Sequence, residues 1–386
     1  MLCASQPQRS RAELSPAAGG TLRRRGVRRV AAAALVLVLA LGAGGPEAAA
    51  ESGRGRPLPA IPFAFYTQET SLALGGMVVR GFRWAKTPPD ARPNSIVAVA
   101  FYTLRHQYSV SVAPGLYLRD GLYHARLSGA FEEWPSTFWG VGRDVSDGDE
   151  EGFTRRSASL EGTLLRRVRG ALRVGPAVDL SFTGITDVEA GGMLDRGTLE
   201  ESDGGRVAGL GLAACWDSRD REFWPAEGAY HSLKVLRYLG DPLGDFPFTQ
   251  ATLDLRAFLP LGGGRVLAVQ ALGVVTDGGA PFFRLARLGG PMNMRGLYQG
   301  RFRDRHMLAV QAEIRVPLGG RFAAAGFLGA GEVAHRLTGF RPGGVLLTGG
   351  AGARFALDPA NRMNLRVDLG VSRFGLAPIV TINEAF

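Results

Sequence analysis

The segment Pro378-Ile-Val-Thr-Ile-Asn-Glu-Ala-Phe386 stands at the end of the sequence and alternates like a strand with one face toward lipid. One face is predicted to carry Val380, Ile382, Glu384 and Phe386, and the other Ile379, Thr381, Asn383 and Ala385. An aromatic last residue on such a strand is typical of outer-membrane β-barrels. We therefore interpret Phe386 as an assembly signal at the end of the last strand, read by the machinery that inserts the barrel.

The same alternation recurs along the chain from residue 56 onward, in runs of eight to twelve residues that end in Gly, Pro, Asp or Asn. Clear examples are residues 178–183, 252–259, 308–316 and 363–370. Period-two alternation repeated this often predicts an all-β protein. On the polar face, acidic residues and arginines lie two residues apart, as in Asp254/Arg256, Glu313/Arg315 and Arg366/Asp368. Such pairs favour a charged lumen only modestly, since a solvated surface carries them too.

Composition agrees with a membrane barrel. The chain is 46% hydrophobic with 55 glycines, yet after residue 50 it holds no apolar run long enough for a transmembrane helix. We predict a closed antiparallel transmembrane β-barrel over residues 60–386. At about twenty residues per strand and turn, this length gives about sixteen strands, an even number, with fourteen as the alternative.

The first fifty residues have the features of an export signal. Arginines at 23–25 and 28–29 precede the apolar run 30–41, and Ala48-Ala-Ala50 offers small residues for cleavage. We predict a cleaved signal peptide over residues 1–50, with a short membrane anchor as the alternative, and a linker over residues 51–59. The predicted location is the bacterial outer membrane.

Charge and composition disfavour other classes. Seven arginines and two glutamates within residues 1–50 carry half of the net charge of +10, and the remaining arginines alternate with apolar residues instead of clustering. We therefore expect no nucleic-acid partner. The five histidines show no metal-ligand spacing and no G-x-S-x-G elbow occurs, so we expect no enzyme, metal or cofactor.

The stretch Arg287-Leu-Gly-Gly-Pro-Met-Asn-Met-Arg-Gly-Leu-Tyr298 is too long and specific for a simple hairpin. It resembles the sixth extracellular loop of the BamA/TamA-like outer-membrane barrels, also called surface-antigen barrels. The resemblance implies a loop that folds back into the barrel, with Arg295, Gly296 and Tyr298 as its docking motif.

Further stretches support the same resemblance over residues 60–386. Trp216-Asp-Ser-Arg-Asp220 with Pro225-Ala-Glu-Gly228 is similar to a hairpin of the family, and Phe63–Gly75 to the first strand of short members. Two departures stand out. Gly329 occupies the position where many members have the Asp that receives the loop arginine, so Glu313 and Glu332 are the candidate partners of Arg295. POTRA modules, which deliver clients in large members, are not recognised.

The resemblance implies a role in outer-membrane biogenesis, by protein or lipid insertion or by translocation. In this role a weak seam between the first and last strands would open laterally. The alternative is a passive pore or a structural surface antigen without a client. Expected partners are outer-membrane lipid, the assembly machinery during the barrel's own insertion, and an unknown periplasmic partner or client protein.

Overall fold

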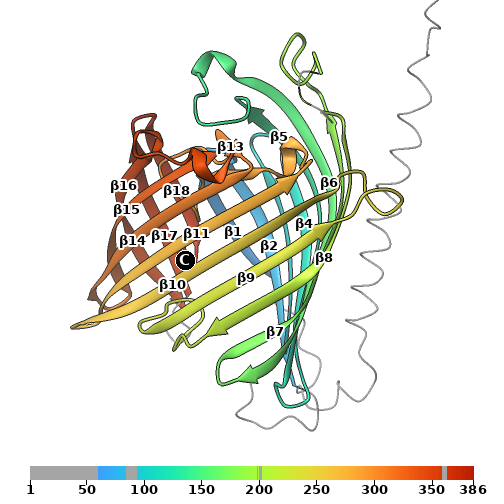
Figure 1. Cartoon of the computed structure of the whole chain (residues 1–386). Helices are drawn as coiled ribbons and strands as arrows, with labels where there is room; N and C mark the ends of the chain where they lie inside the picture. The colour runs from blue at the N-terminus through green and yellow to red at the C-terminus, as the bar shows by residue number, and fades with distance from the viewer. Residues whose placement is uncertain (1–59, 84–93, 198, 200–201, 359–362) are drawn as a thin grey trace, which may run out of the picture.

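The computed structural model describes residues 60–83, 94–197, 199, 202–358 and 363–386 (Figure 1). The predicted signal peptide and linker lie outside these residues. Sixteen strands form the barrel wall within this part of the chain. They are β1 (Ala60–Thr67), β2 (Ser71–Phe82), β3 (Asn94–Thr103), β4 (Tyr108–Leu118), β5 (Tyr123–Phe138), β6 (Glu151–Arg169), β7 (Leu172–Thr186), β8 (Gly204–Asp217), β9 (Gly228–Tyr238), β10 (Phe248–Gly262), β11 (Arg265–Gly278), β14 (His306–Gly319), β15 (Phe322–Ala334), β16 (Leu346–Asp358), β17 (Met363–Ser372) and β18 (Gly375–Ile382).

Each wall strand pairs antiparallel with its neighbours in the chain, and the pairing of β1 with β18 closes the barrel. This confirms the predicted closed antiparallel barrel and the count of sixteen strands over fourteen. The closing pair is unlike the others. β1 and β18 share one register position, Tyr66 with Val380, whereas β1 and β2 share eight.

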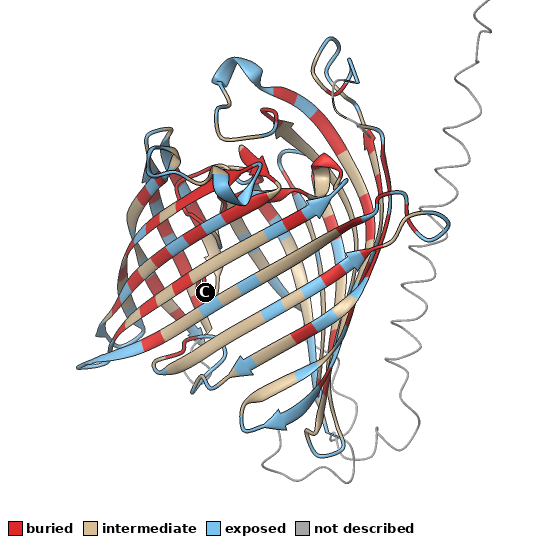
Figure 2. Ribbon diagram, in the orientation of Figure 1, coloured by how far each residue is buried: buried red, intermediate tan, exposed pale blue. Residues whose placement is uncertain are grey.

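Burial alternates along the strands as the sequence predicts (Figure 2). On β10, Leu253, Leu255 and Leu259 are exposed on the outer face, while Phe258 is buried inside. On β14, Leu308, Val310 and Ile314 point outward. Exposed leucines and valines repeat in this way around the wall, as expected for a surface that contacts hydrocarbon. No helix within the described residues is long and apolar enough to cross a membrane.

The two ends of the barrel differ in their connections. Long segments at one end join the strands, at 139–150, 187–203, 239–247, 279–305 and 335–345. At the other end, tight turns such as 170–171, 263–264 and 320–321 join β6 to β7, β10 to β11 and β14 to β15. Outer-membrane barrels have long extracellular loops and short periplasmic turns, which assigns the first end to the outside.

The predicted first strand, Phe63–Gly75, is wrong because this stretch is a hairpin. β1 ends at Thr67, and β2 begins at Ser71. The Thr67 hydroxyl accepts the backbone N–H of Thr70 at 3.1 Å, and Ser71 takes a φ of 56°. A threonine side chain thus closes a turn that holds no Gly, Pro or Asn.

The predicted last strand is also too long. β18 ends at Ile382, and Asn383 takes a φ of 67°, a left-handed conformation that Asn tolerates better than most residues. The chain then turns into the lumen, where Phe386 packs on Phe258 and Ala268 of the opposite inner wall. The predicted placement of Phe386 beside Val380 on one strand face is therefore incorrect. Whether Phe386 is an assembly signal remains a prediction.

Candidate functional site

The connection between β11 and β14, residues 279–305, folds into the barrel. Its centre forms a small hairpin of β12 (Ala286–Leu288) and β13 (Phe302–Asp304). One face of this hairpin is apolar, and it packs on the inner wall in one cluster whose buried members are Ala286, Leu288, Met294, Leu297, Phe302, Met307, Ala309, Val333 and Leu346. Burial of this many apolar side chains gives the loop a fixed position in the lumen.

The tip of the loop approaches β17 backbone to backbone. A Cβ atom on Gly296 would lie 2.9 Å from the carbonyl oxygen of Val371, and one on Gly370 would lie 2.7 Å from the amide nitrogen of Gly296. Gly296 also has a φ of 109°, which only glycine adopts readily. The hydroxyl of Ser372 donates to the carbonyl of Gly296 at 2.7 Å. The Gly in the Arg-Gly motif is therefore required both by conformation and by the close contact with Gly370.

This contact places Arg295 between two carboxylates on the inner wall. Its Nη1 lies 2.5 Å from Glu313 Oε2 on β14 and 2.8 Å from Asp368 Oδ2 on β17. Its guanidinium carbon lies 3.7 Å from the centre of the Phe327 ring on β15. All three charged side chains are fully buried, so these contacts are charge-assisted bonds in a site sheltered from solvent.

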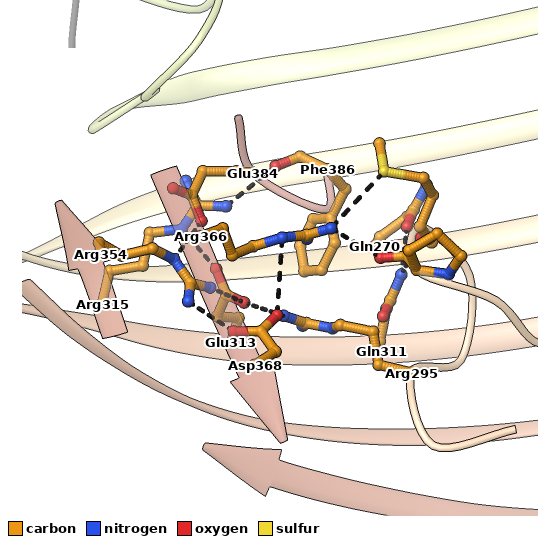
Figure 3. Close-up of polar contacts among 12 residues, drawn as sticks. Gln270, Arg295, Gln311, Glu313, Arg315, Arg354, Arg366, Asp368, Glu384 and Phe386 are labelled. Atoms are coloured by element: carbon orange, nitrogen blue, oxygen red, sulfur yellow. Dashed lines mark hydrogen bonds and ion pairs between the residues drawn. The ribbon is translucent and has the colours of Figure 1, made fainter. Parts of the chain in front are cut away.

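A larger charge cluster surrounds Arg295 (Figure 3). Arg315 Nε lies 2.7 Å from Glu313, and Arg354 bridges Glu313 at 3.1 Å and Asp368 at 2.5 Å. Arg354 also binds Glu384 at 2.7 Å, just beyond the end of β18. We call this set, together with Arg366, the docking cluster; its members are Arg295, Glu313, Arg315, Arg354, Arg366, Asp368 and Glu384.

Glycines and rings shape the space for the docking cluster. A Cβ atom on Gly352 would lie 2.8 Å from Arg354 Nη1, and one on Gly350 would lie 2.5 Å from the ring of Phe327. The run 350–352 therefore leaves room for the ring and for the arginine, which explains two glycines in the middle of β16.

The docking cluster holds four guanidinium groups and three side-chain carboxylates, and Arg315 Nη2 also donates to the main-chain oxygen of Phe386 at 2.9 Å. Accordingly, donors exceed acceptors: within the described residues, Nε and Nη2 of Arg295 and Nε and Nη1 of Arg366 have no hydrogen-bond partner. Arg366 Nη2 instead donates to the carbonyl of Pro291 in the loop, at 3.0 Å. Glu313 and Asp368 each bind more than one arginine, so loss of either carboxylate leaves more than one buried guanidinium group without its partner.

The two candidate partners of Arg295 have different positions. The structure brings Glu313 onto Arg295, but Glu332 is not its partner. Glu332 is bonded to Arg143 and accepts the backbone N–H of Arg341 at 3.1 Å. At Gly329, the position where many relatives were expected to carry Asp, a Cβ atom would lie 2.9 Å from the sulfur of Met294. Met294 of the loop occupies that space, and Asp368 supplies the acidic group from β17.

Tyr298, the third motif residue, points away from the docking cluster. Its ring lies 5.0 Å from the ring of Trp139, just beyond β5, in an edge contact. It therefore fixes the far side of the loop to the β5 end of the wall and contributes nothing to the ion pairs of Arg295.

Sequence reasoning missed Asp368, Arg354 and Glu384 as members of this site. The pairs Glu313/Arg315 and Arg366/Asp368 were visible as same-face charges, but their convergence was not. No pattern in the sequence shows the convergence, because the shared burial of Glu313, Arg354 and Asp368 arises only when β14 to β17 lie side by side.

The loop also reaches the seam. The backbone N–H of Gln299 donates to Glu69 Oε1 at 2.6 Å, and Glu69 lies in the β1–β2 turn. Gln68 of the same turn donates to the carbonyl of Leu376 on β18 at 2.7 Å. The loop thus contacts β17 through Gly296 and the first hairpin through Gln299, on both sides of the β1–β18 pair.

A second arginine attaches the loop to the opposite wall. Nη2 of Arg284 donates to the carboxylate of Asp179 on β7 and to the hydroxyl of Tyr238 on β9, the latter at 2.7 Å. Tyr238 itself donates to Asp179 at 2.8 Å. Arg284 and Arg295 therefore hold residues 279–305 across the lumen from two sides.

The predicted hairpin at 216–228 is present between β8 and β9. Nε of Arg219 lies 2.9 Å from Asp217, and Asp220 accepts the N–H of Ala226 at 2.8 Å. Its Trp224 is buried, with the ring centre 5.2 Å from the Arg315 guanidinium carbon. This periplasmic hairpin therefore contacts the docking cluster from below.

Comparisons with known proteins agree with this fold. A family model described as the Omp85 superfamily domain matches residues 167–371. No curated protein matches the sequence. Among solved structures, BamA from Haemophilus ducreyi lacking POTRA domains 1–3 is similar, with a TM-score of 0.57 at 11% identity over 83% of this chain and 69% of that one.

Two further solved structures are similar. CdiB from Acinetobacter baumannii has a TM-score of 0.53 at 16% identity, over 84% of this chain and 59% of that one. CdiB from Escherichia coli has a TM-score of 0.56 at 10% identity, over 85% of this chain and 68% of that one. At these identities the likeness concerns the fold, and the chain spans only about three-fifths to two-thirds of each of these structures.

Proposed function

Because the chain belongs to the Omp85 superfamily, we propose that it acts in outer-membrane biogenesis or translocation, through a lateral seam between β1 and β18. The observation that carries this proposal is the single register pair, Tyr66 with Val380, that closes the barrel. Family and fold indicate an outer-membrane location; export by a signal peptide at residues 1–50 is part of the proposal.

The seam is weak for identifiable reasons. A backbone hydrogen bond contributes about 0.5–1.5 kcal/mol net, so a closure with one register pair is several kcal/mol weaker than a full ladder. β1 and β2 share eight register positions and β5 and β6 share sixteen. Pro378 adds to the weakness because it has no N–H to donate. Opening at this line therefore costs less than opening at any other pair in the described wall.

The docked loop supports the closed state in this proposal. It holds β17 through Gly296 and the first hairpin through Gln299, so it fastens both sides of the seam at the extracellular end. Within the part of the chain that the structure describes, the loop makes no such contact at the periplasmic end of the seam. A client strand or lipid arriving from the periplasm would meet the less restrained end.

A disulfide lock tests the proposal. In a Cys215→Ser background, Tyr66→Cys with Val380→Cys joins the two seam strands. The matched control joins β9 to β10 through Leu233→Cys and Leu253→Cys, which are direct register partners on the same outer face.

Both pairs are expressed in the native host from which the chromosomal copy is deleted, and outer-membrane permeability to a large dye is measured. We expect the oxidised seam lock to fail to complement and a reductant to restore it, while the control lock complements throughout. Full complementation by the oxidised seam lock would overturn the proposal.

The second candidate is a passive pore. The observation in its favour is a cavity of about 280 Å³ in the lumen, lined by charged side chains that include Arg126, Arg173 and Lys234. A steady open conductance in planar bilayers would support the pore. Brief, flickering events would support the plugged barrel, because the loop crosses the lumen.

We further propose partners of three kinds: outer-membrane lipid, the machinery that inserts the barrel with Phe386 as its signal, and a periplasmic client protein. The chemistry proposed here is non-enzymatic. It needs strand exchange and lipid contact, and neither needs a cofactor.

A further inference from the structure

A second group of arginines lies in the lumen, on the β12–β13 hairpin. Arg287 and Arg303 are direct cross-strand partners, so two like charges stand opposite each other on one face. Such an arrangement destabilises a hairpin unless something compensates it. The apolar residues of the hairpin, such as Leu288 and Phe302, point the other way into the wall. Both side chains therefore leave the hairpin on the face away from that wall, where Arg287 is exposed to the lumen and Arg303 is buried.

The structure draws the two side chains together. A Cβ atom on Gly300 would lie 3.1 Å from Arg303 Nη2 and 3.2 Å from Arg287 Cδ, so both side chains pass close to this glycine. Arg303 is 4% exposed. Its Nε donates to the Gly300 carbonyl at 3.0 Å, and its guanidinium carbon lies 4.8 Å from the Phe138 ring centre. Among the described residues, neither arginine has a carboxylate within ion-pair distance.

A third arginine, Arg155 of β6, acts on both from the facing wall. Enclosure by the surrounding lumen wall, which keeps part of the bulk water away, is the first cause that lowers the pKa of Arg287 below its ordinary value, and repulsion from Arg155 is the second. The pKa of Arg303 is also lowered, first by burial and then by repulsion from Arg287 and Arg155. Arg155 has one carboxylate partner, Glu132, at 3.0 Å. These three guanidinium groups form one ion pair, so two of them have no carboxylate within ion-pair distance, and Glu69 acts on Arg287 only from farther away.

We propose that Arg155, Arg287 and Arg303 form a lumenal binding site for a phosphate-class dianion. The two negative charges of the dianion match the two guanidinium groups that have no carboxylate within ion-pair distance. Each planar guanidinium group can also donate a pair of hydrogen bonds to two phosphate oxygens. Arg287 is exposed to the lumen, which gives the ligand a path to the site. A free phosphate and the phosphate of a lipid headgroup share this chemistry. The site lies on a face of the loop opposite to the one that packs on the wall, and it uses none of the docking cluster.

Calorimetry on the full chain, refolded in a zwitterionic detergent and free of phosphate, tests the site. One arm titrates inorganic phosphate, and a second adds mixed micelles containing phosphatidic acid, with phosphatidylcholine micelles as reference. Binding in the first arm identifies a free phosphate as sufficient. Binding only to phosphatidic acid identifies a lipid headgroup. No binding in either arm up to about 10 mM, the range of very weak complexes, would overturn the proposal.

Variants connect binding to these residues. Arg287→Gln and Arg303→Gln should each weaken the affinity at least tenfold. Arg321→Gln, on the exposed turn between β14 and β15, serves as the matched control and should bind like the parent chain. Arg287→Gln should also raise the unfolding midpoint in phosphate-free buffer, since it removes a like-charge contact. That second readout keeps the test decisive if Arg303→Gln fails to refold. An unchanged affinity in the Arg287→Gln variant would refute the assignment.

Discussion

Loss of Arg295 should release the loop, whereas loss of Glu313 should also destabilise the barrel. Arg295→Gln removes charge-assisted bonds to Glu313 and Asp368, each worth about 1.5–3 kcal/mol. No carboxylate is left unpaired by this change, because Glu313 keeps Arg315 and Arg354, and Asp368 keeps Arg354. We therefore expect Arg295→Gln to reduce the free energy of loop docking by about 3 kcal/mol, near the lower end of the sum for the two bonds, and to leave the barrel wall unchanged.

Glu313→Gln has a different charge balance. Glu313 is bonded to three arginines, and without it the four guanidinium groups keep only Asp368, Glu384 and the main-chain oxygen of Phe386 as acceptors within the cluster. Breaking a buried pair by removing the compensating charge costs about 3–5 kcal/mol, and here the cost falls on wall strands as well as on the loop. Glu313→Gln should therefore be less stable than Arg295→Gln, because Glu313 binds three arginines whereas loss of Arg295 leaves no carboxylate unpaired.

Hydrogen exchange measured by mass spectrometry in detergent micelles reports loop docking. The amides of Gly290, Leu297 and Gly300 are bonded to carbonyls within the loop or its hairpin, so they exchange slowly while the loop is docked. A cost of about 3 kcal/mol should accelerate their exchange roughly a hundredfold in Arg295→Gln. The strands β9 and β10 should keep their protection.

Arg256→Gln is the matched control, because Arg256 is also a lumenal arginine and binds Asp254 at 2.6 Å outside the docking cluster. It should leave loop exchange unchanged. Exchange in Arg295→Gln within threefold of the parent chain would refute the reasoning. So would a urea unfolding midpoint that is lower for Arg295→Gln than for Glu313→Gln.

Three further perturbations probe separate contacts. Gly296→Ala should undock the loop without changing any charge, because its Cβ would meet the β17 backbone. Gly279 lies in the same connection with open space around it, so Gly279→Ala should leave the hydrogen-exchange rates of the loop unchanged. Arg284→Gln should break the second attachment of the loop, so we expect larger or longer-lived conductance steps in planar bilayers. Recordings like those of the parent chain would count against that attachment. Glu69→Gln should loosen the link between loop and first hairpin, seen as faster protease cleavage at the β1–β2 turn; unchanged cleavage would show that this contact contributes little.

The barrel itself was largely predictable because the alternating pattern of each strand depends only on residues that are close together in the sequence. Alternation places leucines and valines on the outer face of every strand, and each strand can be judged alone. The ends of the seam were not predictable in this way. The turn after Thr67 uses hydroxyl groups in place of glycine, and the residues after Ile382 continue an alternating pattern although the chain leaves the strand.

The docking site was predictable only in part. The Arg-Gly motif indicated the loop, and the acidic residue on the strand after it, Glu313, lies where a partner was expected. Asp368 could not be assigned because it lies 73 residues from Arg295 in sequence. Asp368 meets Arg295 only because of the register of the four neighbouring strands β14 to β17 and the backbone contact of Gly296 with Gly370. Neither the register nor the contact leaves a pattern in the sequence.

The most direct test of the seam measures how far apart its two strands move. In a Cys215→Ser background, spin labels at Tyr66 and Val380 report the distance across the seam by electron paramagnetic resonance in lipid nanodiscs. Labels at Leu233 and Leu253 report the same spacing across β9 and β10, where the ladder is complete. We predict a broad or two-component distance distribution at the seam, widened further by Arg295→Gln, beside a narrow one at β9–β10. Equally narrow distributions at both places, unaffected by Arg295→Gln, would contradict the proposed lateral opening.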